Sequence, residues 1–310
     1  MRAAVVSSFE APPRYQEVAE PVAAGRDEMV VEVLAAALHP RVRSQADGSH
    51  YTSTEELPLV PGIDAVVRDP KGRIRYTVLD DTTLGTMAER TVIETDRSVV
   101  LPDHIDPVQV AAAMNPVMSS WVALRRRIDF QRRQRVLILG ATGSAGRMAI
   151  QVAKRFGAGQ VIAAGRDAAR LERLRALGAD VVCTFDELAR AADVDVVIDY
   201  VWGEPAARAM VALLTARADR SAPLTWVQIG SVAGPDAPIP SAALRSARLQ
   251  IVGSGIGSVP GRDFIKELPK MAAAVGDGAF DVRARAVPLA EVERAWMDTL
   301  GTPERIVFVP

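Results

Sequence analysis

Three glycines follow a short apolar run in the middle of the chain. Gly140, Gly143 and Gly146 are spaced three residues apart, and residues 136–139 before them read Val-Leu-Ile-Leu. Such a turn lacks Cβ atoms, so backbone N–H groups and the positive end of a following helix can approach a phosphate closely. Although this spacing alone is equally typical of a structural turn, a preceding apolar strand and a following amphipathic helix favour dinucleotide binding. The residues predicted to hold the pyrophosphate are Gly140, Thr142, Gly143, Ser144, Ala145 and Gly146.

The next strand and helix indicate which dinucleotide is bound. A NAD site has an acidic residue about 20 positions further on, where it binds the ribose hydroxyls; this chain has Gly165 there. Without that carboxylate a 2′-phosphate is not repelled, and Arg166 offers a planar cation with several donors. These residues favour NADPH. The alternative is that Arg166 is a surface residue and Asp167 takes the acidic role, although Asp167 also suits the N-cap of a helix at residues 168–177.

Alternating strands and helices must position this turn. After Pro116 long helical segments alternate with short apolar runs, which is typical of a parallel, doubly wound sheet. The predicted strands of this sheet are residues 136–139, 161–164, 181–183, 194–199, 224–230 and 249–254.

The rest of the chain has a β-rich pattern. Turn residues separate the short runs there, which predicts an all-β or barrel-like domain. The tail predicts a strand near 282–287, an amphipathic helix at 289–300 and a final strand at 306–309 that fold back onto this domain. The runs predicted as strands in the first hundred residues are 1–6, 29–34, 65–67, 76–78, 87–92 and 99–101.

Composition narrows the class of protein. A chain of 310 residues fits two domains better than one core, and a net charge of -1 gives no excess charge to attract nucleic acid or acidic membranes. Its single cysteine, Cys183, leaves no internal disulfide and no four-cysteine zinc lobe, so we expect a cytoplasmic protein. No window approaches the roughly 18 apolar residues that a membrane span needs.

Further segments carry a family pattern over nearly the whole length. They are residues 57–64, 149–154, 177–180, 287–292 and 305–308. With the glycine turn, these segments resemble the medium-chain dehydrogenase/reductase superfamily, in particular its zinc-free quinone oxidoreductase branch. The resemblance implies an α/β protein: a GroES-like, mainly β barrel catalytic domain at 1–118, a doubly wound NADP-binding Rossmann domain at 119–274, and a return to the catalytic domain at 275–310.

The same comparison predicts that catalysis uses no metal. Zinc alcohol dehydrogenases have Gly-His-Glu where this chain has Gly62-Ile63-Asp64, and their two cysteine ligands fall near Val42 and Asn115. A catalytic zinc needs about three protein ligands, and isoleucine has no lone pair to offer. We therefore expect zinc-independent chemistry.

The remaining chemistry is direct hydride transfer from a nicotinamide to a conjugated acceptor, in which the protein supplies alignment and a hydrogen bond to the developing oxyanion. Candidate donors are Tyr51, His39 and Ser119. Tyr51 follows a segment that resembles the family's substrate loop. For each donor a structural role is the alternative: a tyrosine packed on a loop, a histidine capping a turn, or a serine at a helix start.

The resemblance also implies residues for the rest of the site. Asn115 and Trp121 belong to a segment, 114–121, that should border the nicotinamide and line the substrate pocket. The loops after the fourth to sixth strands should lie along the nicotinamide, although their glycines also suit ordinary turns. The residues predicted there are Tyr200, Ile229, Gly230, Ser231, Gly253, Ser254 and Gly255.

These features predict an NADPH-dependent reductase of quinones or α,β-unsaturated carbonyls. The alternatives are an enoyl reductase of a biosynthetic pathway and a catalytically silent NADPH-binding redox sensor, because a fold does not by itself imply an activity. The family further implies a homodimer in which two sheets join edge to edge at residues 249–254, which would cover an exposed strand.

Overall fold

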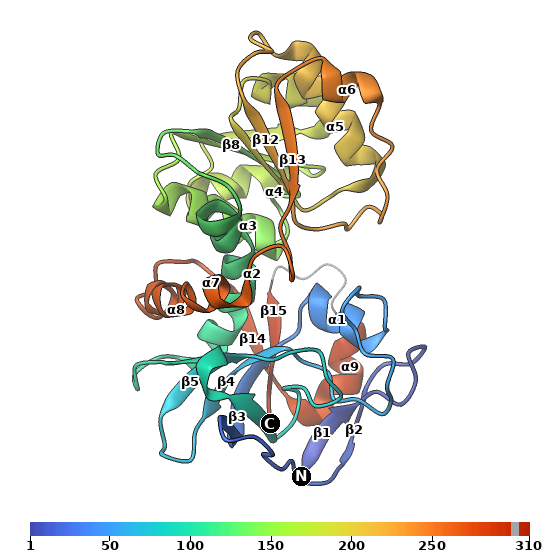
Figure 1. The fold of residues 1–310 in the computed structure, drawn as a ribbon, viewed down its shortest axis with the longest axis vertical. Helices are drawn as coiled ribbons and strands as arrows, with labels where there is room; N and C mark the ends of the chain where they lie inside the picture. The colour runs from blue at the N-terminus through green and yellow to red at the C-terminus, as the bar shows by residue number, and fades with distance from the viewer. Residues whose placement is uncertain (299–303) are drawn as a thin grey trace. The chain divides into compact units, whose positions relative to one another are not determined.

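The chain divides into two compact units. The computed structural model describes residues 1–298 and 304–310. The first unit comprises Met1–Asn115 and Ile265–Pro310, and the second unit comprises Pro116–Phe264 (Figure 1). The sequence predicted boundaries at 118/119 and 274/275, so residues 116–118 and 265–274 group differently from that expectation.

The second unit is built on a parallel six-stranded sheet. Its strand order is β10-β9-β8-β11-β12-β13, and every neighbouring pair is parallel. Every strand predicted for this half is present, with ends that differ by no more than two residues, so the doubly wound prediction is confirmed. The strands are β8 (Arg135–Leu139), β9 (Gln160–Gly165), β10 (Val181–Thr184), β11 (Val196–Asp199), β12 (Leu224–Gln228) and β13 (Leu249–Gly253).

Short helices connect these strands. Apolar side chains of β8, β9 and β11 pack with those of α5 in the core of this unit, where Trp226 is fully buried. The helix predicted at 168–177 is divided into an α-helical turn and a following 3-10 segment that ends at Gly178, which has a φ of 102°. The connecting helices are α3 (Ser144–Arg155), α4 (Ala168–Glu172), η3 (Arg173–Leu177), η4 (Phe185–Ala191), α5 (Gly203–Ala216) and α6 (Ser241–Arg245).

The first unit is the predicted β-rich domain. β15 and β14 pair in parallel, the other neighbours are antiparallel, and β6 pairs with β3 beside the main path β14-β15-β3-β4-β5-β7. β2 was not predicted, because its sequence Arg-Tyr-Gln-Glu has no apolar alternation and pairs only with β1. The strands are β1 (Arg2–Val5), β2 (Arg14–Glu17), β3 (Glu28–Ala37), β4 (Asp64–Arg68), β5 (Ile74–Val78), β6 (Arg90–Glu94), β7 (Ser98–Val100), β14 (Ala284–Pro288) and β15 (Arg305–Val309).

Two helices differ from the prediction. The helix α2 begins at Pro107 rather than after Pro116, which lies inside it, and a π-helical turn, η2, follows. The tail helix predicted at 289–300 contains a 3-10 turn and α9, while its predicted end at Leu300 lies outside the described residues. The remaining helices are η1 (Thr95–Arg97), α1 (Pro40–Ala46), α2 (Pro107–Val122), η2 (Ala123–Arg127), α7 (Gly261–Ile265), α8 (Leu268–Gly276), η5 (Leu289–Glu291) and α9 (Val292–Met297).

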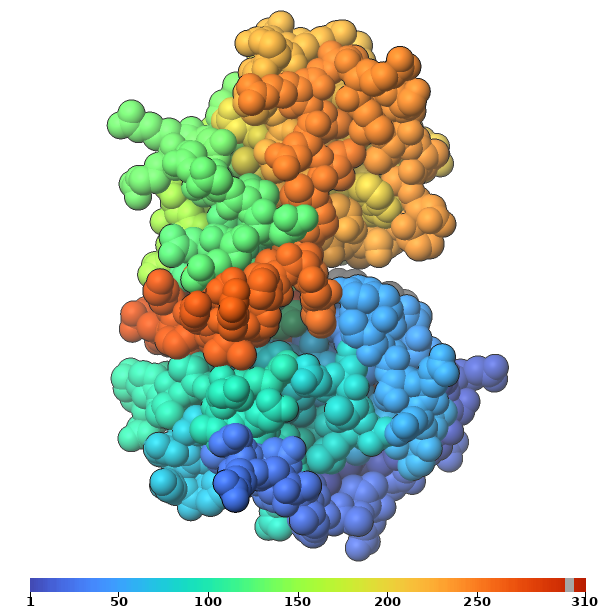
Figure 2. Space-filling model, viewed as in Figure 1, coloured from blue at the N-terminus to red at the C-terminus, as the bar shows by residue number. Residues whose placement is uncertain are grey.

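The strand β13 ends one side of the six-stranded sheet. It pairs with β12 alone within the described chain, and its residues are half-buried or exposed. The orange segment that contains it reaches the surface shown in Figure 2. Across residues 1–298 and 304–310, no helix combines the length and apolar character needed to cross a membrane.

Candidate functional site

The glycine turn connects β8 to α3 at the carboxyl edge of the parallel sheet. Gly140 has a φ of 78°, and its carbonyl accepts a hydrogen bond from Gly143 N at 3.1 Å. A Cβ on Gly146 would lie 2.4 Å from that same carbonyl oxygen and 2.6 Å from the Cα of Ala141. The turn is therefore closed so tightly that only glycine fits at position 146.

The helix α3 presents its first backbone N–H groups at this turn. Gly143 is the N-cap residue, with extended backbone and no side-chain capping bond, and the first helical turn contains no acidic residue. The N–H groups of Ser144, Ala145 and Gly146 have no intrahelical acceptor, as at any helix start, and the helix dipole favours an anion there. The geometry fits a pyrophosphate group on the backbone.

The end of β9 lies beside the turn. A Cβ on Gly165 would lie 3.3 Å from Thr142 Cγ2, which brings the end of the second strand next to the glycine turn. Arg166 is exposed, and its guanidinium has no hydrogen-bond or ion-pair partner among residues 1–298 and 304–310. Asp167 caps α4, since its Oδ1 accepts from Arg170 N at 3.0 Å. The capping bond engages the carboxylate that the alternative interpretation needed for the ribose.

The topology indicates where a dinucleotide would cross the sheet. The strand order reverses direction between β8 and β11, and ligands of doubly wound sheets bind in the crevice at that point. One half of a dinucleotide would then lie over β9 with Gly165 and Arg166. The other half would lie over the loops that follow β11 and β12.

Those two loops are hydrogen-bonded together. The N–H groups of Ile229 and Gly230 both donate to the carbonyl of Asp199, at 2.8 and 3.1 Å. A Cβ on Gly230 would lie 2.9 Å from the carbonyl oxygen of Tyr200, so a close approach of two backbones requires glycine there. The N–H groups of Ile229 and Gly230 therefore serve the loop itself, and Ser231 is exposed at its surface.

The loop after β13 is also tied to its neighbours. Ser254 N donates to Gln228 O at 2.8 Å, and the carbonyl of Gly253 accepts from Arg127 Nε at 2.6 Å. Gly255 N donates to Ser258 Oγ at 2.8 Å. The three predicted residues therefore lie at the carboxyl end of the terminal strand, where hydrogen bonds to β12, η2 and their own turn hold them.

Ser119 and Tyr200 form a hydroxyl pair in the second unit. Ser119 lies in the last turn of α2, not at a helix start, and its Oγ donates to Pro116 O at 2.9 Å. The Tyr200 hydroxyl is 3.0 Å from Ser119 Oγ. Burial raises the pKa of Tyr200 to about 12, so its hydroxyl stays protonated at neutral pH and can donate. Sequence reasoning named both residues without indicating that they meet.

His39 belongs to a buried polar cluster in the first unit, which we call the Asp64 cluster: His39, Asp64, Tyr76 and Arg305. His39 Nε2 donates to Asp64 Oδ1 at 2.9 Å, and the Tyr76 hydroxyl donates to Asp64 Oδ2 at 2.7 Å. Burial lowers the pKa of His39, which favours the neutral ring. A neutral imidazole has one N–H, and Asp64 already accepts it, so none remains for a substrate.

Arg305 completes this cluster by its charge. It is 7% exposed, burial lowers its pKa to about 10, and the charge of Asp64 opposes that shift. Its Nε and Nη1, like Nδ1 of His39, have no hydrogen-bond partner within the described residues. Sequence reasoning missed Arg305, because it lies in an apolar strand and contributes to the cluster only after β15 pairs with β3.

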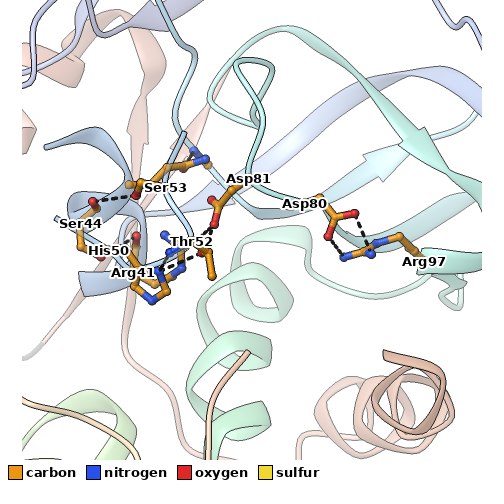
Figure 3. Close-up of polar contacts among 10 residues, drawn as sticks. Arg41, Ser44, His50, Thr52, Ser53, Asp80, Asp81 and Arg97 are labelled. Atoms are coloured by element: carbon orange, nitrogen blue, oxygen red, sulfur yellow. Dashed lines mark hydrogen bonds and ion pairs between the residues drawn. The ribbon is translucent and has the colours of Figure 1, made fainter. Parts of the chain in front are cut away.

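Tyr51 lies in a polar segment of the same unit. It is 70% exposed and stacks on His50 with ring centroids 4.2 Å apart. Arg41 of α1 bonds to Thr52 and Asp81, and Thr52 also bonds to Asp81 (Figure 3). The three residues Arg41, Thr52 and Asp81 form what we call the loop clasp, which joins the first turn of α1 to two surface loops. No sequence motif marked this clasp.

The two predicted pocket residues of α2 have different surroundings. Asn115 is half-buried, whereas Trp121 is 5% exposed and packs edge-on against Phe156, with ring centroids 4.8 Å apart. At the positions compared with zinc ligands, Val42 is fully buried and Ile63 packs in the apolar core. In the described part of the chain, no three His, Cys, Asp or Glu side chains come together in a way that could hold a metal ion.

Known proteins resemble both the sequence and the fold. The family model described as zinc-binding dehydrogenase matches residues 145–274, which excludes the positions compared with catalytic zinc ligands. A probable NADPH-dependent quinone reductase of Emericella nidulans is 30% identical, and the alignment covers all of both chains. An NADPH-dependent alkenal/one oxidoreductase of Arabidopsis thaliana is 29% identical, over 51% of this chain and 45% of its own length.

Solved structures extend the likeness to the whole chain. The quinone oxidoreductase of Thermus thermophilus, which has been solved alone and with NADPH, superposes with a TM-score of 0.83 at 25% identity and full coverage of both chains. The expected fold class is thereby confirmed over the full length. The chain belongs to the medium-chain dehydrogenase/reductase superfamily and, within it, to the proteins that resemble quinone oxidoreductases.

Proposed function

We propose that this protein is an NADPH-dependent, zinc-independent reductase that transfers a hydride to a quinone or an α,β-unsaturated carbonyl. The observation that carries the proposal is the exposed Arg166 beside Gly165, next to the tightly closed glycine turn and the first N–H groups of α3. This arrangement suits a pyrophosphate and a 2′-phosphate together. The full-length relative named as an NADPH-dependent quinone reductase supports the same choice.

Each part of the proposed site has a separate task. The turn and the start of α3 would bind the pyrophosphate, and Arg166 would bind the 2′-phosphate. NADPH, when bound, supplies a hydride from C4 of its nicotinamide. Tyr51 and Ser119 stay candidates for the donor that stabilises the oxyanion of the acceptor. Ser119 Oγ already contacts the Tyr200 hydroxyl, so a substrate at Ser119 would have to compete for or share that contact.

The test is NADPH oxidation by the purified protein with a panel of quinones and α,β-unsaturated ketones and aldehydes, followed by loss of absorbance. NADH is compared under the same conditions. We expect turnover with NADPH and a kcat/KM at least about tenfold lower with NADH, because one lost charge-assisted contact has that size. Failure to bind NADPH, measured by its fluorescence, would overturn the proposal.

The two alternatives give different results when enoyl thioesters are added to the same panel. An enoyl reductase would turn over enoyl thioesters and leave quinones unchanged; a curated relative from Caenorhabditis elegans, 28% identical over 56% of this chain, is named as an enoyl-[acyl-carrier-protein] reductase. A silent redox sensor would bind NADPH tightly but would not oxidise it, whichever acceptor of the panel is added.

We also propose that the protein is a homodimer joined through β13. Paired edges would satisfy the outward backbone groups of this terminal strand. Light scattering on the eluting protein is expected to give twice the mass of one chain. A Gln250→Lys variant adds a positive charge to the exposed edge strand of each copy, so charge repulsion should shift the mass toward one chain. A single-chain mass for the unaltered protein would contradict the proposal.

A further inference from the structure

Trp202 has a backbone conformation that residues with side chains avoid. Its φ is 52° and its ψ is -159°, close to the region that glycine almost alone occupies. The residue directly precedes α5 and is followed by Gly203, which has a φ of 64°. Such an outlier persists only where its surroundings hold it, and it points to a functional reason for placing the side chain there.

A buried carboxyl group holds the backbone of this residue. Asp199, at the end of β11, is fully buried, and its Oδ1 accepts from Val201 N at 2.7 Å and from Trp202 N at 3.0 Å. Its Oδ2 accepts from the indole N–H of Trp226 at 2.9 Å. Three donors therefore converge on one side chain and fix the turn from β11 into α5.

The indole of Trp202 ties this turn to the loop after β12. Its Nε1 donates to Pro235 O at 3.0 Å, and Ala233 N donates to Val201 O at 2.9 Å. The partly buried ring packs against the core of the second unit. The indole thus connects two loops that are separate in the sequence and adjacent at the carboxyl edge of the sheet.

These loops lie on one side of the point where the strand order reverses. A Cβ on Gly140 would lie 3.1 Å from Val201 Cγ2, so the turn before Trp202 touches the glycine turn. The second unit therefore has a continuous wall from the glycine turn through residues 199–203 to residues 229–235. Arg166 follows β9, on one side of the glycine turn, whereas residues 199–203 and 229–235 follow β11 and β12, on the other side.

We propose that Trp202 is a positioning residue for the nicotinamide end of the cofactor. Its strained backbone and its bond to Pro235 hold the loops after β11 and β12 in one arrangement before the cofactor arrives. Ordering that wall in advance lowers the cost of binding and sets the position of the reacting ring. This inference rests on the proposed NADPH-dependent function.

Three substitutions separate the ring, its N–H group and the backbone strain. Trp202→Phe keeps an aromatic ring and loses the donor to Pro235. Trp202→Ala and Trp202→Gly both lose the ring, but only glycine relieves the strain. Trp296→Phe, a buried indole in the core of the first unit, is the matched control for changing a tryptophan.

For Trp202→Phe we expect the Kd for NADPH to rise about three- to tenfold, which corresponds to the loss of one hydrogen bond. We also expect kcat to fall, because the nicotinamide ring is held less firmly in position. Trp296→Phe should leave the Kd and the kcat per folded molecule unchanged. Trp202→Gly should melt about 2–4 °C above Trp202→Ala because glycine accepts the left-handed backbone. Both should bind NADPH more weakly than Trp202→Phe.

The outcomes distinguish this inference from the function on which it rests. If the unaltered protein does not bind NADPH, the proposed function fails. If it binds, and the three Trp202 variants bind and turn over NADPH as it does, the positioning role is wrong. Equal melting temperatures for the alanine and glycine variants would show that no backbone strain exists at this residue, and would also overturn the inference.

Discussion

The glycine turn and the Asp64 cluster are both suited to charge, but they are built from different groups. The turn uses backbone N–H groups and the absence of side chains at Gly140 and Gly146. The cluster uses the side chains of His39, Asp64 and Arg305, which come from three separate parts of the chain. A backbone site is therefore recognisable from contiguous residues, whereas a side-chain site depends on which strands pair.

The Gly146→Val variant tests whether the closed backbone of the glycine turn is needed to bind NADPH. The new side chain would collide with the carbonyl of Gly140, so the turn must open. We expect NADPH affinity to fall by about 100-fold or more, because opening the turn would remove two or more hydrogen bonds from backbone N–H groups to the charged pyrophosphate, each contributing about 1.5–3 kcal/mol. Titration of NADPH fluorescence measures it, and affinity within about threefold of the unaltered protein would contradict the account of the turn.

Gly143→Ala is the companion to that variant. A Cβ there would lie 3.5 Å from Gly140 O, an ordinary contact, and the φ of Gly143 is -75°. The variant should fold and melt like the unaltered protein. Any loss of NADPH affinity would then report a phosphate close to the backbone rather than a distorted turn.

A substitution of Asp64 tests how much the side chains of the Asp64 cluster contribute to stability. Asp64→Asn keeps a hydrogen-bond acceptor for Tyr76 but removes the charge that offsets buried Arg305. Asp64 and Arg305 form no direct ion pair, so we expect a loss of about 1–3 kcal/mol from the uncompensated charge and the altered hydrogen bonds of Asp64. Urea unfolding should show that loss, with Glu204→Gln, an exposed ion-pair partner of Arg208, as a control within about 0.5 kcal/mol. Equal stability of both variants would contradict the role of Asp64.

A further change tests the charged side chain that the proposed cofactor site requires for the 2′-phosphate. Arg166→Ala should lower the preference for NADPH over NADH about 10- to 100-fold through loss of charge-assisted hydrogen bonds. The ratio of kcat/KM values measures it. Arg208→Ala, which removes an exposed positive charge from α5, is the control. An unchanged ratio in both variants would show that residues other than Arg166 bind the 2′-phosphate.

The smallest expected effect concerns His50, beside the loop clasp. Partial burial and the charge of Arg41 lower the pKa of His50 to about 4. Because the folded pKa lies below the unfolded value of about 6.5, the unfolded chain binds the proton more readily between these values. Stability contributed by the neutral ring is therefore complete above about pH 6.5 and is lost as the pH falls toward 4.

After discounting for partial exposure, this contribution is about 1 kcal/mol. Urea unfolding at about pH 7 and pH 5 should show it in the unaltered protein, together with a contribution of the same sign from His39, whose pKa is also lowered. His50→Gln should reduce the difference, and His104→Gln, which is exposed, should leave it unchanged. A pH dependence that survives His50→Gln in full would exclude His50 as its source.

Much of the fold could be predicted because periodicity is a local property. The six apolar runs of the second unit all became strands, and those in the middle of the sheet are apolar throughout because both of their faces are buried. β2 escaped prediction because it is largely exposed and has no such run. The helical pattern was predicted only after Pro116, whereas α2 begins at Pro107 and continues through that proline.

The sequence likewise predicted the local features of the site but not the contacts between distant residues. Asp167 as an N-cap followed from its position before a helix, and the structure confirms it. The pairing of Ser119 with Tyr200, and the use of the only N–H of neutral His39 by Asp64, did not follow. Those contacts join residues that no spacing rule relates.

The sequence by itself determined the parallel sheet, the glycine turn and the absence of a carboxylate at the end of β9, because each depends on residue types within a few positions of one another. Only the tertiary structure decided that Arg305 lies buried with Asp64, and that Trp202 is held in a glycine-like conformation. The reason is physical. Burial of a charge and strain of a backbone are tolerated only where distant segments supply the compensating contacts.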